Sequence, residues 1–414
     1  MKASRVVQYL LVCIAVALGL VLEANADCPL TRPMIEGTNR IFANRDLSGN
    51  YVPKLIQRVQ TGEVLHMICQ PDDIVETTCQ PDNNFNPPLP MSCMNPMPAT
   101  AINVTDAFCP TTMYSIGYTI NNQRLELYRA CYDRTNVRAL YTTHTVYGKP
   151  FYPTRPDVDF SLDNVLSPAD ARTFTVRSIY GAFRRIFGEN QTYIPNNRAV
   201  VINRGHLTPS ADYLYKDQMG ATFKYVNVVP QFKTINDGNW EAIERWVRGL
   251  IRCGGSLRIK TGAVGTLILP DTSRPPVPHC AILGAETKNP VPEWMYKAVR
   301  TSTNQLVAIF LTYNNIYAPE RPSAPKFCEP VPCPIFLPNT AVAGFTYCCN
   351  GTNNFESDLM YATMYALLTY LHTHTYVTLL LIYCLHVLHS QSFQFPVKIF
   401  ASPSIGMARS SRPM

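Results

Sequence analysis

Residues 203–252 read NRGHLTPSADYLYKDQMGATFKYVNVVPQFKTINDGNWEAIERWVRGLIR. Short apolar runs at 199–202 and 223–229 predict two strands on either side of a loop. From Trp240 to Ile251, apolar residues recur at helical spacing and predict a helix. The predicted order is therefore strand, loop, strand, helix.

The same stretch brings an imidazole, an amide, a carboxylate and a guanidinium close together in sequence. His206 follows the first predicted strand. Asn236, Trp240, Glu244 and Arg248 recur every four residues, so we expect them along one side of the predicted helix. The helix would then present its polar groups to the loop that carries the histidine.

These groups suit the hydrolysis of a phosphodiester, whose anionic oxygens repel a nucleophile. His206 can remove a proton from water near neutral pH. Mg²⁺ keeps most of its waters and needs few protein oxygens, so the side-chain carbonyl of Asn236 could hold it together with a phosphate oxygen. Glu244 could then hold a metal-bound water, and Arg204 or Arg248 could contact the phosphate.

At these residues the sequence resembles the DNA/RNA non-specific endonucleases with a ββα-metal site. NRGH at 203–206 is similar to the DRGH box of that family, and NVVPQ at 227–231 is similar to its N-x-x-P-Q strand. Over 204–240 the chain is most similar to secreted nucleases of arthropod guts that degrade double-stranded RNA. The match covers nearly the whole body of the chain and has most of its motifs at 203–248.

The resemblance implies an α+β fold: a ββα-metal nuclease domain with an antiparallel sheet and flanking helices, preceded by a small disulfide-rich β domain. It implies that His206 is the general base and Asn236 the direct Mg²⁺ ligand, with Mn²⁺ as an alternative ion. It assigns Glu244 to a supporting place beside the metal and Arg248 to a phosphate contact. RNA, double-stranded RNA in particular, and DNA are the implied substrates, and no protein partner is implied.

Two further arginines and one departure complete this prediction. Family members carry a functional arginine upstream of the histidine box, and Arg155 is our candidate; Arg204 is the second candidate for substrate binding. Asn203 stands where many members have Asp. This departure motivates an alternative, a catalytically inactive extracellular protein that binds nucleic acid.

Each of these residues also has a simpler interpretation. A histidine after a strand is usually structural, and an asparagine before a helix is often an N-cap. Glu244 and Arg248 would by default form an exposed ion pair on a helix. The combined spacing over fifty residues favours the nuclease.

The N-terminus and the cysteines predict export. Residues 1–26 have the charged start, apolar core and small-residue end of a secretory signal peptide. Between 27 and 350 lie twelve cysteines, which predict about six disulfides in a secreted chain, without CxxC spacing that would suggest zinc. Sequons at Asn103, Asn190 and Asn350 could carry glycans. The net charge of +7 is compatible with a polyanionic substrate but common among secreted proteins.

The mature chain is expected to have two domains. Residues 27–145 contain six cysteines, clusters of turn residues and short alternating runs, which predict a small disulfide-rich β domain. Its histidines, His66 and His144, are interpreted as structural. Residues 146–350 are expected to form the endonuclease domain, with a helix at 171–187. If the β domain instead carried the function, the protein would be an extracellular interaction protein.

Residues 351–414 differ in character from the rest. The segment 370–388 is apolar and long enough to cross a membrane, but several histidines would then lie at membrane depth. These histidines could also suggest metal binding. The interpretation we favour is an aberrant extension appended to a soluble, secreted enzyme.

Overall fold

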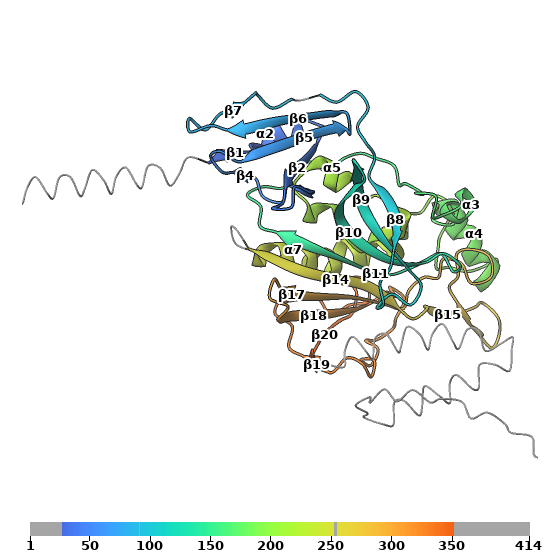
Figure 1. Ribbon diagram of the computed structural model, residues 1–414. Helices are drawn as coiled ribbons and strands as arrows, with labels where there is room; N and C mark the ends of the chain where they lie inside the picture. The colour runs from blue at the N-terminus through green and yellow to red at the C-terminus, as the bar shows by residue number, and fades with distance from the viewer. Residues whose placement is uncertain (1–26, 91, 252–254, 352–414) are drawn as a thin grey trace, which may run out of the picture. The chain divides into compact units, whose positions relative to one another are not determined.

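A nine-stranded antiparallel sheet is the largest element of the computed structural model, which describes residues 27–90, 92–251 and 255–351 (Figure 1). Its strand order is β19-β20-β18-β17-β14-β11-β10-β9-β8. In chain order the strands are β8 (Thr100–Val104), β9 (Thr112–Ile120), β10 (Gln123–Asp133), β11 (Arg138–Tyr147), β14 (Ser256–Val264), β17 (Trp294–Thr301), β18 (Leu306–Tyr313), β19 (Pro330–Val331) and β20 (Thr346–Cys349). The apolar runs at 113–120, 294–298 and 306–312 of the sequence lie within three of these strands, β9, β17 and β18.

Side chains of the central strands alternate between two hydrophobic cores, because successive residues of a strand point to opposite faces. Ile259 and Val299 pack in one core with Ile243 and Val247 of helix α7 (Glu241–Leu250). Trp294, from the same strand as Val299, packs in the core of the other face. One face of the sheet therefore supports α7, and the opposite face does not.

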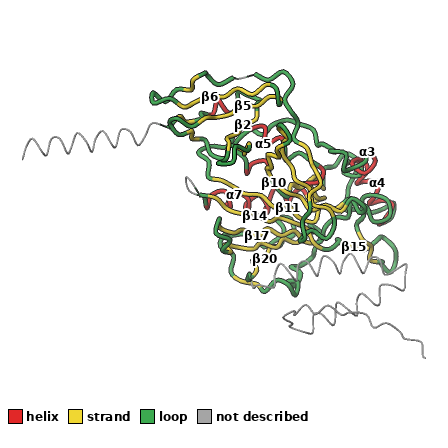
Figure 2. Tube along the Cα trace, viewed as in Figure 1, coloured by secondary structure: helices red, strands yellow, loops and turns green. Residues whose placement is uncertain are grey.

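The predicted strand, loop, strand and helix are confirmed in that order. Figure 2 marks the last of them, α7, in the colour of the helices. The elements are strand β12 (Ile202–His206), a 3₁₀ turn (Ser210–Asp212), helix α5 (Lys216–Gly220), a second 3₁₀ turn (Tyr225–Asn227), strand β13 (Val228–Phe232), helix α6 (Lys233–Ile235), a π-helical turn (Asn236–Trp240) and α7. The strands β12 and β13 pair antiparallel, with His206 opposite Val228. The strands lie further along the chain than expected, so the histidine box belongs to the first strand itself.

The first part of the chain forms a separate five-stranded sheet of order β3-β2-β5-β6-β7. Its elements, with the small β1-β4 sheet and one helix, are β1 (Cys28–Pro29), α2 (Arg32–Glu36), β2 (Ile41–Arg45), β3 (Tyr51–Pro53), β4 (Arg58–Val59), β5 (Val64–Gln70), β6 (Asp73–Cys79) and β7 (Phe85–Asn86). Tyr215, from the loop between β12 and β13, packs on Phe42 with ring centroids 4.5 Å apart and donates to the backbone oxygen of Ile56 at 2.7 Å. The N-terminal sheet thus holds the loop that follows His206.

The domain boundary expected at residues 145 and 146 falls inside β11. This strand pairs with β10 on one side and with β14 on the other. Strands β8 to β11 therefore share one sheet with β14, β17 and β18 of the second expected domain, and all described residues fall in one compact unit. The clusters of turn residues correctly indicated a β-rich segment at 27–145. They could not show that its last strands, β8 to β11, join the large sheet.

The helix expected at 171–187 is two helices, α3 (Pro168–Arg172) and α4 (Val176–Phe187). Ser167 caps α3 by accepting a hydrogen bond from the Asp170 amide, and Thr175 caps α4 by accepting from the Ser178 amide. A new N-cap at Thr175 starts a second helix, because its side chain satisfies an amide that has no partner within the helix. A short ribbon of β15 (Ile268–Pro270) and β16 (Pro278–Cys280) completes the fold.

Five disulfides lie within the described residues, against the expected six. They are Cys28–Cys79, Cys69–Cys93, Cys109–Cys131, Cys328–Cys349 and Cys333–Cys348. Cys280 is exposed and unpaired, and Cys253 lies outside the described residues. Two bridges lie in the N-terminal part with the five-stranded sheet, Cys109–Cys131 fastens the segment before β9 to β10, and two fasten the last strands of the large sheet.

The predicted signal peptide at 1–26 and the apolar segment at 370–388 lie outside the described residues. Within the part of the chain that the structure describes, every helix is too short or too polar to cross a membrane.

A buried acid in α5 gives a prediction for stability. Burial raises the pKa of Asp217 from 3.8 to about 7, and the Gln218 amide offsets only part of this increase. The neutral form is favoured in the folded state, so the contribution of Asp217 to stability is present below pH 4 and is lost as the pH rises through 7. We expect Asp217→Asn to raise the free energy of unfolding at pH 8.5 by about 2 kcal/mol, less than the full shift because the amide is also buried.

Urea denaturation with the disulfides intact measures this effect at pH 5 and pH 8.5. Exposed Asp72 provides the control, because Asp72→Asn should change the stability equally little at both pH values. A gain from Asp217→Asn that is the same at both pH values would contradict the assignment.

Candidate active site

His206 stands at the end of β12 among aromatic rings. Its ring centroid lies 5.3 Å from that of Phe160 and 5.2 Å from that of Phe223, the latter edge to face. Burial, followed by the positive charges of Arg155 and Arg204, lowers the pKa of His206 to about 3. The imidazole is therefore neutral at physiological pH and able to accept a proton.

The two nitrogens of this imidazole differ in their surroundings. A hydrogen bond to the Arg204 backbone opposes the lowering of the His206 pKa. Nε2 is buried and has no hydrogen-bond partner among the described residues. Since a bond at one ring nitrogen fixes the tautomer, Nε2 is the atom that carries the open lone pair. This nitrogen is therefore available to a ligand or a reacting group.

Two guanidinium groups flank this imidazole and rest on rings. Arg155 lies 4.9 Å from the ring centroid of Phe223, and Arg204 lies 4.4 Å from that of Phe160. Arg204 also donates to the hydroxyl of Tyr225 at 3.4 Å. Among residues 27–90, 92–251 and 255–351, neither guanidinium forms a salt bridge with a carboxylate. Both are exposed, so a phosphodiester could supply the anion that they lack.

Asn236 begins the π-helical turn, and its amide nitrogen donates to Asp237 at 2.9 Å. That bond uses Nδ2, so the carbonyl oxygen is the atom suited to a cation. The chain is not regular after it, because Gly238 has φ −101° and ψ −118°. A β-carbon at Gly238 would lie 3.0 Å from the backbone oxygen of Ala343, so the close approach of that loop sets the kink. The spacing predicted that Asn236 would continue the side of α7 that carries Glu244. The kink at Gly238 interrupts the regular helix between them, so this prediction is wrong.

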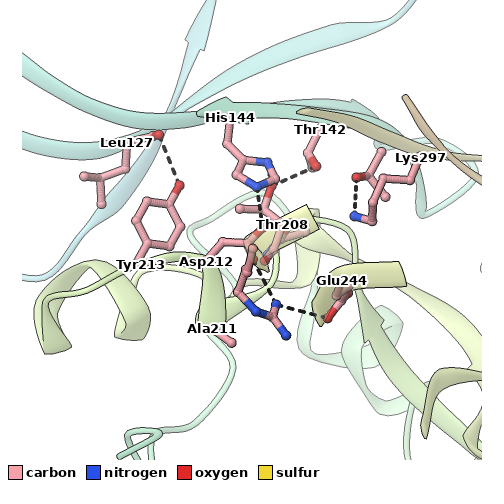
Figure 3. Close-up of polar contacts among 12 residues, drawn as sticks. Leu127, Thr142, His144, Thr208, Ala211, Asp212, Tyr213, Glu244 and Lys297 are labelled. Carbon is pink, nitrogen blue, oxygen red and sulfur yellow. Dashed lines mark hydrogen bonds and ion pairs between the residues drawn. The ribbon is translucent and has the colours of Figure 1, made fainter. Parts of the chain in front are cut away.

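Glu244 and Arg248 join a buried polar network around Asp212. Figure 3 shows Asp212 with Glu244 and His144. Arg248 Nη1 donates to Asp212 Oδ1 at 3.0 Å and lies 3.8 Å from Glu244 Oε2. His144 Nε2 lies 2.8 Å from Asp212 Oδ2. The side chain of Arg248 is 7% exposed and that of Asp212 is 4% exposed, so both charges are nearly removed from water. The pair on α7 is therefore not the exposed ion pair of the simpler interpretation.

Burial and charge act in opposite directions on these groups. Burial raises the pKa of Glu244 to about 7, although Lys297 and Arg248 oppose the increase. Burial also acts to raise the pKa of Asp212, but the hydrogen bond from His144 and the charge of Arg248 hold it well below its usual range. Asp212 is therefore the fixed negative charge of the network, and Glu244 can exchange a proton near neutral pH.

The predicted residues form two groups in the structure. Arg155, Arg204 and His206 come together at the aromatic cluster, while Glu244 and Arg248 lie in the buried network. Asn236 stands between them in the chain, after the strand that pairs with the His206 strand and before α7.

Sequence reasoning missed three members of the network. Asp212 lies within the histidine motif but received no role, His144 was interpreted as structural, and Lys297 lies in an apolar strand. The ammonium of Lys297 donates to Thr261 at 2.7 Å and lies 5.1 Å from the ring centroid of Trp240. The signal that could have found Lys297 is a charged residue at an inward position of a buried strand.

Known proteins match the part of the chain that contains these residues. The model of the DNA/RNA non-specific endonuclease family matches residues 109–354, more than half of the chain. This chain belongs to that family.

Two salivary proteins are similar in sequence to this member of the non-specific endonuclease family. Salivary endonuclease of Lutzomyia longipalpis is 27% identical over 62% of this chain and 62% of its own length. Salivary protein Tsal1 of Glossina morsitans morsitans is 22% identical over 58% of this chain and 62% of its own length. The chain thus spans less than two thirds of each relative.

A solved structure of the EndoG/EndoGI complex is 20% identical to this chain, with a TM-score of 0.32. The match covers 47% of this chain and 74% of the matched chain in that structure. The family match begins at Cys109, within the segment between β8 and β9, so the N-terminal five-stranded sheet precedes it.

Proposed function

We propose that the protein is a divalent-metal-dependent endonuclease that hydrolyses phosphodiester bonds of RNA and DNA. The observation that carries this proposal is the open, buried Nε2 atom of His206 between the guanidinium groups of Arg155 and Arg204. The nitrogen is neutral, and a phosphate bound to the two cations would oppose their lowering of the His206 pKa, so that the imidazole could take a proton from water. Membership of the family supports the same reaction.

In this proposal each side chain has a defined task. His206 Nε2 accepts a proton from the attacking water, and its other nitrogen, bonded to backbone, holds the ring in place. Arg155 and Arg204 bind the anionic oxygens and position the phosphate for in-line attack. Because the contacts are to the backbone of the polynucleotide, little base specificity is expected.

Asn236 is the proposed ligand of a divalent cation, Mg²⁺ before Mn²⁺. Its carbonyl oxygen fits a hard ion that keeps most of its waters. Among the described residues there is no cluster of three or more His, Cys, Asp or Glu side chains that could hold a metal. This donor set suits an ion bound by one protein oxygen and the substrate. Such a cation would supply positive charge to the phosphate oxygens.

The substrate and the compartment are also proposals. Five disulfides are typical of an oxidising, extracellular environment, and two similar proteins are named as salivary. We infer that the protein acts outside the cell. Double-stranded RNA is the proposed preferred substrate, on the resemblance of residues 204–240 to nucleases that degrade it.

Metal removal tests the proposal against the inactive nucleic-acid-binding alternative that Asn203 motivates. Purified protein is incubated with long RNA and with long DNA in Mg²⁺, in EDTA, and in EDTA followed by excess Mg²⁺. We expect EDTA to lower the cleavage rate by about 1000-fold or more and Mg²⁺ to restore it, because the metal contributes several kcal/mol to the transition state. Binding without cleavage in all three conditions would establish the alternative, and cleavage that persists in EDTA would remove the metal from the mechanism.

A further inference from the structure

Lys297 places a charge in the apolar core between the large sheet and α7. Met295 and Val299, two residues before and after it on β17, both pack in that core, so Lys297 points to the same face of the sheet. The residue is only 1% exposed. A lysine is almost never fully buried unless an anion is paired with it. Its position therefore indicates a nearby negative charge.

Two contacts hold the ammonium of Lys297 in place. Thr261 is its direct neighbour in the pairing of β14 with β17, and Lys297 Nζ donates to the Thr261 hydroxyl at 2.7 Å. The same nitrogen lies 5.1 Å from the ring centroid of Trp240. Trp240 and Glu244 are four residues apart in helical backbone, so they share one side of the helix. The ammonium therefore lies over the side of α7 that carries Glu244, and Figure 3 shows both side chains.

The carboxyl group of Glu244 is surrounded by charged and titratable groups from several elements. They are Lys297 of β17, Asp212 of the 3₁₀ turn, Arg248 and Glu241 of α7 and, behind Asp212, His144 of β11. Burial is the largest effect and raises the pKa of Glu244 to about 7. Among the charges, Lys297 opposes this increase most, ahead of Arg248.

These charges balance when Glu244 is a carboxylate. Arg248 lies 3.0 Å from Asp212 and 3.8 Å from Glu244, so its closest counter-charge is Asp212. His144 has a pKa lowered by burial and is neutral at physiological pH. Lys297 is then the cation that a negative Glu244 neutralises. Without that cation, Glu244 would bind a proton, because a buried carboxylate that lacks a counter-charge favours its neutral form.

The protonation state of Glu244 decides what the side chain can do in the reaction. A carboxylate accepts hydrogen bonds at both oxygens and can orient a water molecule, whereas the neutral acid presents a donor in place of one acceptor. We propose that Lys297 is a positioning residue of the nuclease: its ammonium, held by Thr261 and Trp240, keeps Glu244 in the carboxylate form that orients water at the catalytic site. This role rests on the proposed function. Lys297 acts through Glu244 and does not touch the substrate.

Replacing Lys297 by methionine tests this role, because the variant removes the charge and keeps an unbranched side chain. The pH dependence of kcat/KM for long RNA is measured in Mg²⁺ from pH 5.5 to pH 9. In the wild type we expect kcat/KM to rise with a midpoint near pH 7, as Glu244 loses its proton. Lys297→Met should raise this midpoint by about one pH unit or more, since an opposite charge is lost. Cleavage should then be slower by about 10-fold at pH 6 and close to the wild-type rate at pH 9.

The protonation of Glu244 can also be followed without metal or substrate. NMR of full-length protein labelled with ¹³C at the glutamate carboxyl carbons records their titrations, and Glu244→Gln identifies the signal of Glu244. We expect Lys297→Met to raise the midpoint of this signal by the same amount as the midpoint of kcat/KM. Aspartates carry no label, so Asp217, whose pKa is also about 7, does not interfere.

Further variants separate this role from a purely structural one. Lys297→Arg keeps the charge and should keep the wild-type midpoint in both measurements. Lys288→Met removes an equal charge from the pair with Asp170, whose atoms are 2.9 Å apart, and should change neither midpoint. If Lys297→Met does not fold, Lys297→Gln replaces it, because the amide can still donate to Thr261. A loss of cleavage that is equal at every pH, or an unchanged titration of Glu244, would overturn the proposal.

The two measurements also distinguish this proposal from the proposed function. If the wild type cleaves neither RNA nor DNA at any pH, the proposed function fails and the positioning role fails with it. If the wild type cleaves both but Glu244 titrates identically in the wild type and in Lys297→Met, the proposed function stands and the role of Lys297 is disproved.

Discussion

Replacing His206 by alanine is expected to lower the rate of RNA and DNA cleavage by about 1000-fold or more, because a general base contributes up to about 10⁴-fold. The variant has no group that can take the proton at the place of Nε2. Arg155 and Arg204 would remain, so RNA binding in EDTA should be retained. Rates on long and short substrates with Mg²⁺, together with binding by anisotropy, measure both effects.

The fold should survive this replacement. The alanine removes a buried nitrogen that has no partner among the described residues, which compensates for part of the packing lost. Secretion and the melting temperature are therefore expected to change little. His279→Ala is the matched control, because His279 pairs with Asp271 at 3.2 Å outside the site and should leave cleavage intact. A His206→Ala protein with wild-type activity would disprove the assignment of the base.

Replacing Asp212 by alanine is expected to cost about 3–5 kcal/mol of stability, the usual effect of removing one partner from a buried ion pair. Arg248 would then lie in the interior without its closest counter-charge, and His144 would lose its hydrogen-bond acceptor. Activity should also fall, since Arg248 would no longer be held beside Glu244. Chemical denaturation gives the stability, and cleavage by the folded fraction gives the activity.

Two comparisons make this test specific. Glu241→Ala breaks the exposed pair with Arg245, whose atoms are 3.8 Å apart, and should cost less than about 1 kcal/mol. Asp212→Asn keeps the shape of the side chain but removes its charge. The stability of this variant should therefore lie between that of the wild type and that of Asp212→Ala. If Asp212→Ala is as stable as Glu241→Ala, Asp212 is not the charge that holds the network together.

Local patterns in the sequence were sufficient for much of the fold. Apolar runs indicated some strands of the large sheet, such as β9, β17 and β18, and helical spacing found α7, because both patterns arise from one element that covers a core. Two apolar runs followed by helical spacing predicted the order of β12, β13 and the helix. These features depend on residues close together in the chain, and the structure confirms them.

Features that depend on distant residues could not be predicted in the same way. The kink at Gly238 follows from the contact with Ala343, and the bond between His144 and Asp212 joins residues 68 positions apart. The sequence spacing of Asn236 and Glu244 was therefore correct, while their placement along one regular helix was not. The split helix at Thr175 has a local cause instead: one hydrogen bond from the Ser178 amide to the Thr175 side chain outweighs a continuous apolar pattern.

The pairing of β11 with β14 has a consequence for how the chain reaches its final form. Tyr141 lies opposite Gly262, and the whole segment that carries the proposed catalytic groups is synthesised between these neighbours. Growing chains must therefore extend past β14 before the central sheet can close, and such long-range closure is slow. Until that moment the catalytic segment lacks its supporting platform, so a nascent or truncated chain is expected to be harmless to RNA inside the cell that makes it.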